Sequence, residues 1–120
     1  MLSEKLHNAI NAQINAELWS AYLYLAMSLD AENKGYKGVA NWFYVQFQEE
    51  QAHARIFMNY LNSRDAKVTL LPIEEVPATW NSVLDMYKQT LEHECEDPLP
   101  PNTKTNRRTQ TWKSSKRPKD

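Results

Sequence analysis

The chain has 120 residues, 42% hydrophobic and 24% charged, and this balance is typical of one small globular domain. It excludes a chain that is disordered throughout, and no apolar run approaches the roughly 18–20 residues that a membrane-spanning helix needs. The N-terminus does not resemble a signal peptide, and Cys95 is the only cysteine. We therefore expect no internal disulfide, no membrane association and a cytoplasmic location.

The net charge of −1 conceals two segments of opposite charge. Residues 1–97 carry 7 Lys and Arg against 14 Asp and Glu, whereas residues 98–120 carry 7 Lys and Arg against Asp120 alone. Three prolines at the start of the second segment mark the change. We expect a folded unit over residues 1–97 and a disordered, basic, Pro-rich tail over residues 98–120.

Residues 4–32 predict one long helix, with Ser3 as its N-cap. Residues three and four positions apart form an apolar stripe with a carboxylate in its middle: Ile10, Ile14, Glu17, Ala21 and Tyr24. Residues 33–38 contain both glycines of the chain, at positions 35 and 38, and predict a short loop.

Residues 39–64 predict a second long helix with the same spacing. Its stripe is interrupted by a carboxylate and an imidazole: Val39, Trp42, Gln46, Glu50, His53, Phe57 and Tyr60. Because the preceding loop is short, the two helices are expected to be antiparallel neighbours.

The next segment, residues 65–78, contains Pro72 and Pro77 and therefore cannot be one helix. Fully extended it reaches about 46 Å, and the second helix is about 39 Å long, so the segment can return along the whole bundle. A third helix is then expected from near Thr79, parallel to the second. Its stripe again includes a carboxylate: Trp80, Leu84, Tyr87, Leu91 and Glu94.

The predicted helices bring their polar stripe residues to one level. Glu17 and His53 are equally far from Gly35 along the chain, so folding about this glycine places them opposite one another. Glu50 lies one turn from His53 on the same face. With the third helix parallel to the second, Glu94 lies within about one turn of the same height.

Three buried carboxylates with no Lys or Arg on their stripes would repel one another, and a bound cation removes this cost. Carboxylates with one imidazole suit iron or manganese, and the absence of a thiolate argues against structural zinc. The Glu-x-x-His pair of Glu50 and His53 lets one helix supply two ligands, as in ferritin-like di-iron bundles.

Residues 1 to about 96 closely resemble the first part of bacterial non-haem ferritins. The likeness rests on Asn15–Tyr24, on Gln48–Ala54, and on the long crossover followed by Glu94. It implies a ferritin-like helical bundle, a subunit of a hollow cage of twenty-four chains that oxidises Fe(II) at a di-iron centre and stores Fe(III) mineral.

The resemblance also implies residue roles. Glu17 and His53 would be terminal ligands of one iron, Glu50 would bridge, and Glu94 would belong to the second iron. Glu49 matches a position that helps to form a third, outer iron site. Tyr24 matches a tyrosine held close to the centre, although core packing is its simpler role.

Haem is not expected from this resemblance. A haem-containing bacterioferritin would have Met directly after the first Glu of the motif, where this chain has Gln51.

The family pattern is interrupted near residue 97, because the sequence beyond it predicts no amphipathic fourth helix. We therefore expect three helices with one apolar face uncovered, and impaired oxidation and assembly. Two alternatives to a storage subunit follow: a non-enzymatic chain that joins full-length ferritin subunits, and a two-fold dimer with a shared di-iron site. Binding of nucleic acid by the basic tail is a more distant interpretation.

Overall fold

The computed structural model describes residues 2–95, which form three α-helices and no strand. The helices are α1 (Glu4–Asn33), α2 (Lys37–Ser63) and α3 (Val83–Cys95), with a long crossover between α2 and α3. The predicted all-α fold is confirmed for this part of the chain. None of these helices is long and apolar enough to span a membrane. The predicted basic tail, residues 98–120, lies outside the described residues.

The chain divides into two compact units, which we describe separately. The first covers residues 1–81 and contains α1, α2 and the crossover. The second begins at Ser82, and its described part is α3.

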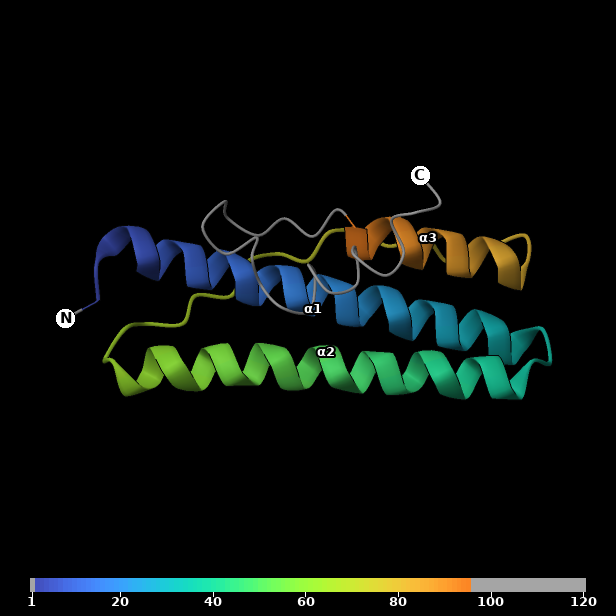
Figure 1. The fold of residues 1–120 in the computed structure, drawn as a ribbon, viewed down its shortest axis with the longest axis horizontal. Helices are drawn as coiled ribbons and strands as arrows, with labels where there is room; N and C mark the ends of the chain where they lie inside the picture. Colours follow the sequence, from blue (N-terminus) through green and yellow to red (C-terminus); the bar gives the residue numbers. More distant parts are fainter. Residues whose placement is uncertain (1, 96–120) are drawn as a thin grey trace. The chain divides into compact units, whose positions relative to one another are not determined.

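The α1–α2 pair is the structural core of the first unit, and the two helices run antiparallel side by side (Figure 1). Tyr24 and Phe43 are both fully buried, and their rings stack with centroids 6.2 Å apart. Trp42 packs edge-on against Phe43 at 5.1 Å. Each large apolar side chain buried in this way contributes about 1.5–3 kcal/mol to stability.

The ends of α1 follow the sequence closely. Ser3 Oγ accepts a hydrogen bond from the Leu6 amide, as predicted for an N-cap. At the other end, Gly35 adopts a φ of 89°, its amide donates to the carbonyl of Glu32, and the Tyr36 amide donates to that of Ala31. This is the two-bond helix ending that needs a left-handed residue, which explains why glycine stands there.

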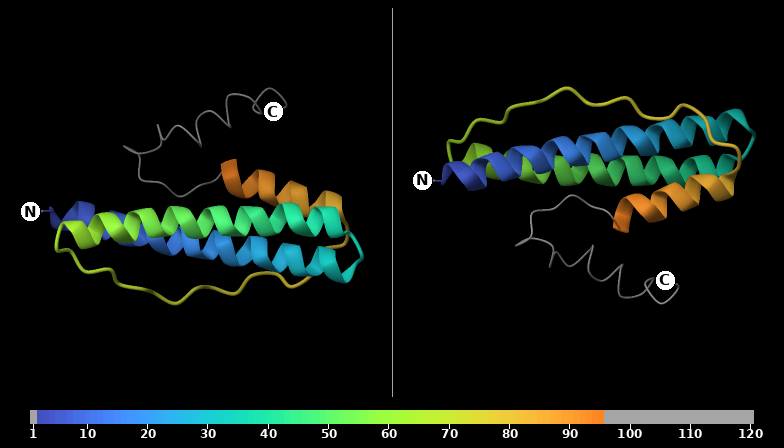
Figure 2. Two further views of the ribbon diagram at one scale, coloured as in Figure 1. Left: turned by 90° about the horizontal axis from the view of Figure 1, so that it is seen from below. Right: turned by 90° about the horizontal axis from the view of Figure 1, so that it is seen from above.

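The crossover begins by bonding to the first turns of α1. The Asn11 side chain donates to the carbonyl of Lys67 at 3.1 Å and accepts from the amide of Thr69 at 2.9 Å. His7 Nε2 also lies 2.8 Å from the Lys67 carbonyl. From here the segment runs the length of the helix pair (Figure 2).

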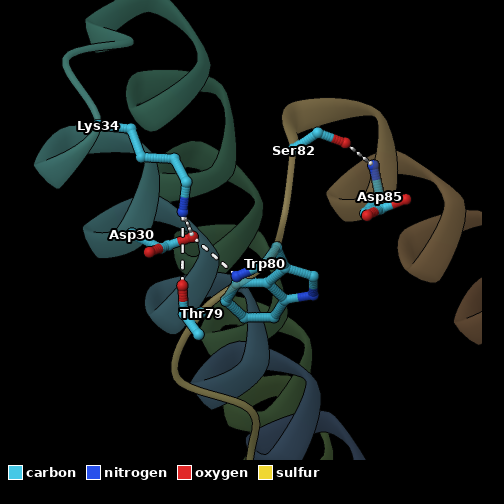
Figure 3. A network of polar contacts seen from close by, with 6 residues as sticks. All are labelled: Asp30, Lys34, Thr79, Trp80, Ser82 and Asp85. Atoms are coloured by element: carbon cyan, nitrogen blue, oxygen red, sulfur yellow. Dashed lines mark hydrogen bonds and ion pairs between the residues drawn. The ribbon is translucent and has the colours of Figure 1, made fainter.

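The crossover ends at the opposite end of α1, on the buried carboxylate of Asp30 (Figure 3). Asp30 Oδ2 accepts from the Trp80 amide at 3.0 Å and pairs with Lys34 Nζ at 2.6 Å. Lys34 Nζ also lies 3.5 Å from the Thr79 hydroxyl. Burial of Asp30 opposes ionisation, but the bonds from Lys34 and Trp80 outweigh it and lower the pKa of this carboxyl below its ordinary value.

The third helix begins later than the sequence indicated. We expected it to begin near Thr79, but the Trp80 amide is held by Asp30 and α3 begins at Val83. Ser82 Oγ accepts from the Asp85 amide at 3.1 Å, which is the geometry of an N-cap (Figure 3). The capping serine therefore sets the first residue of α3.

Candidate metal centre

Three ligand-type side chains meet between α1 and α2. Glu17 lies near the middle of α1, and Glu50 and His53 lie one turn apart on α2. Only 6% of Glu17 and 3% of Glu50 is exposed, and His53 is half-buried. The helix pair thus holds two carboxylates in its interior next to one partly accessible imidazole.

The distances between these groups are those of a shared site. His53 Nδ1 lies 3.6 Å from Glu17 Oε1 and 3.4 Å from Glu50 Oε1. One ligand atom from each of the three residues falls within 4.8 Å of the others. The inference that Glu17 lies level with His53 is therefore correct.

The donor set fits a small cation. With metal–ligand bonds of about 2.0–2.2 Å, neighbouring ligand atoms stand about 3.0–3.5 Å apart. The distances of 3.6 and 3.4 Å from His53 Nδ1 to the two carboxylates are close to this spacing. Two buried carboxylates also need compensating positive charge, since burial of an uncompensated carboxylate costs several kcal/mol. Oxygen donors with one imidazole favour iron or manganese among the common metals.

A fourth residue at this site was missed in the sequence analysis. Gln13 is 7% exposed, and its Nε2 donates to Glu17 Oε2 at 2.8 Å. It lies one turn before Glu17, on the same side of α1. A polar residue four positions from a buried carboxylate was the available signal, because side chains at this spacing are neighbours on a helix.

Three further residues were predicted at this site, and the structure gives the surroundings of each. Glu49 is exposed on α2, and Tyr24 is fully buried against Phe43. Glu94 is a half-buried residue of α3, which belongs to the second unit. Its approach to the cluster therefore stays a prediction.

Comparison with known proteins identifies the family. The model of the ferritin-like domain family, named Ferritin, matches residues 7–96. The chain belongs to this family.

Its relatives include bacterial non-haem ferritins. One from Bacteroides fragilis is 44% identical over 94 residues, which are 78% of this chain and 59% of the relative. One from Staphylococcus aureus is 34% identical over 96 residues, covering 80% of this chain and 58% of the relative. The chain thus spans about three fifths of the length of these ferritins.

Solved structures agree with this assignment. An open-pore ferritin from the hyperthermophilic archaeon Archaeoglobus fulgidus superposes with a TM-score of 0.77 at 35% identity, covering 99% of this chain and 68% of that one. A humanised archaeal ferritin gives a TM-score of 0.77 at 33% identity, with the same coverage. The predicted resemblance to bacterial non-haem ferritins and the predicted fold class are confirmed.

Proposed function

We propose that this chain binds and stores iron as a cytoplasmic ferritin-like subunit, and that it oxidises Fe(II) at a di-iron site within the helix bundle. The observation that carries the proposal is the convergence of Glu17, Glu50 and His53 on one point between α1 and α2. Iron is the substrate of this site rather than a resident cofactor.

Each residue has a defined task in this proposal. Glu17 and His53 would bind the first Fe(II) from opposite helices, and the carboxylate of Glu50 would bridge the first iron and the second. The short distances from His53 Nδ1 to Glu17 Oε1 and Glu50 Oε1 support these roles. His53 is the most accessible of the three residues, and we propose that it is the ligand that entering iron meets first. The two negative charges attract the cation and compensate its charge within the helix pair.

The second iron needs further ligands. Glu94 is proposed to supply one from α3, and exposed Glu49 to belong to an outer site on the path of the iron. In the oxidation, each of two Fe(II) ions loses one electron. The electron pair reduces one molecule of dioxygen or hydrogen peroxide, with uptake of two protons.

The proposal is tested by anaerobic titration of Fe(II) into the purified full chain, followed calorimetrically. The wild type should bind Fe(II) stoichiometrically. Glu50→Ala and His53→Ala should abolish tight binding, because each variant removes one of the three proposed ligands. Retention of stoichiometric binding by Glu50→Ala would show that the site is wrongly assigned.

A matched control lies next to the site in sequence. Gln51 follows Glu50 on α2, but its side chain is exposed. Gln51→Ala should bind Fe(II) as the wild type does. Loss of binding in this control would point to a general effect of substitutions in α2 rather than to ligand removal.

A further inference from the structure

The buried side-chain amide of Gln13 donates a hydrogen bond to one of the two carboxylate oxygens of Glu17, a proposed iron ligand. Its Nε2 donates to Glu17 Oε2 at 2.8 Å, and the other oxygen of the same carboxylate, Oε1, is the one that lies 3.6 Å from His53 Nδ1. The two oxygens of Glu17 therefore have different surroundings. Oε2 accepts a hydrogen bond from a residue of α1, and Oε1 faces α2.

We infer that Gln13 is a positioning residue that restricts Glu17 to binding metal through a single oxygen. The inference rests on the function proposed above and adds the residue that sets the coordination mode. A carboxylate with both oxygens available can rotate and chelate a cation, whereas a hydrogen bond from a fixed donor to Oε2 opposes that rotation.

Burial makes the hydrogen bond from Gln13 effective. Gln13 and Glu17 are 7% and 6% exposed, so water competes little for either group. Residues four apart on a helix are neighbours, so the bond needs no displacement of the backbone. Loss of this hydrogen bond would leave a buried carboxylate oxygen without a donor, which costs free energy, so the bond is favoured.

The chemistry of the donor matters as well. An amide supplies a hydrogen bond without bringing a positive charge next to Glu17, so it does not compete electrostatically with the cation. A Lys or Arg at position 13 would orient the carboxylate equally well but would neutralise it. Residues that hold metal ligands in this way change metal affinity about 10–100-fold when they are substituted.

The test uses Co²⁺, which is stable in air, as the probe for the site in the full chain. Visible absorption per bound Co²⁺ falls as the number of ligand atoms rises, so it reports the coordination mode independently of the affinity. Gln13→Met preserves the length of the side chain but removes the donor. It should bind Co²⁺ about 10–100-fold more weakly, because the carboxylate of Glu17 is no longer held in place. It should also absorb less per bound ion, because Glu17 then binds the metal through both oxygens.

The control is Gln48→Met on the exposed face of α2, which makes the same replacement away from Glu17. It should match the wild type in affinity and absorption. An unchanged absorption per bound ion in Gln13→Met, whatever its affinity, overturns the inference and leaves the proposed function intact. If the wild type binds no Co²⁺, or Glu50→Ala binds it with an unchanged spectrum, the inference and the proposed function fail together.

Discussion

At the scale of single residues, burial of the Glu17 and Glu50 carboxylates costs free energy, and this cost points to a bound cation. Both carboxylates are less than a tenth exposed, and both face one imidazole nitrogen. Such a cluster destabilises the helix pair unless a cation compensates it. Stability of the helix pair and binding of metal are therefore coupled.

Substitutions of Tyr24 can distinguish a role in core packing from a role in the iron chemistry. Its side chain is fully buried and stacks on Phe43, as a core residue would. We predict that Tyr24→Phe binds Fe(II) with the stoichiometry of the wild type, because the ring and its packing are kept. Tyr24→Ala should lower the free energy of unfolding by about 3–5 kcal/mol.

Calorimetric titration and urea unfolding of the two Tyr24 variants measure these effects. Loss of Fe(II) binding in Tyr24→Phe, with stability preserved, would contradict the packing role and place the phenol at the metal centre.

At the scale of the elements, the crossover is fixed at both ends by polar side chains of α1. Asn11 binds its start and Asp30 binds its end. Because Asn11 lies in the first turns of α1 and Asp30 in its last turn, these anchors align the connection along the helix.

We predict that the Asp30 anchor makes stability dependent on pH. The pKa of Asp30 is lowered in the folded chain, so ionised Asp30 stabilises the fold above the ordinary pKa of aspartate, and this contribution is lost as the pH falls through the lowered value. Asp30→Asn should reduce the free energy of unfolding by about 1–3 kcal/mol at neutral pH. The difference from the wild type should disappear at strongly acidic pH.

Urea unfolding at a series of pH values measures this difference. Glu32→Gln is the matched control, since Glu32 pairs with Lys37 on the surface, where both side chains are more than half exposed. It should leave stability unchanged. A constant difference between the wild type and Asp30→Asn at every pH would contradict the assignment to the charge of Asp30.

Sequence periodicity predicted α1 and α2 well because both helices bury a continuous stripe and end at recognisable residues. Ser3 and Gly35 act locally, and their effects are readable without tertiary information. The first residue of α3 was not predictable in this way. Asp30 binds the Trp80 amide, 50 positions away in the sequence, and Ser82 then caps the helix.

The approach of Glu17 to His53 was also predictable from the sequence. Symmetry about Gly35 placed Glu17 opposite His53, because helices have a fixed rise per residue and the loop is short. Gln13 was missed because its only signal was its spacing of four residues from Glu17. Its importance appears only once the buried oxygen that it binds is known.

At the scale of the whole molecule, the first unit exposes many large apolar side chains. On α1 and α2 they include Tyr22, Leu29, Trp42 and Ile56, with exposed fractions between 42% and 64%. A cleft between the outer face of α1 and the crossover is also lined mainly by apolar residues, among them Leu25, Ile73 and Val76. Surfaces of this kind are typical of proteins that associate.

We predict that the purified chain self-associates, because association covers these side chains. Sedimentation velocity at several protein concentrations measures the size of the particle. A large uniform particle agrees with a storage subunit, and a two-chain particle with one di-iron centre agrees with the shared-site alternative. A chain that stays monomeric and folded over the concentration range would contradict the prediction.

The proposed metal centre between α1 and α2 is tested most directly by anomalous X-ray scattering at the iron edge, from crystals prepared with Fe(II) without oxygen. We predict an iron peak within bonding distance of Glu17, Glu50 and His53. Iron bound only elsewhere, with Glu17 and His53 turned away from each other, would contradict it.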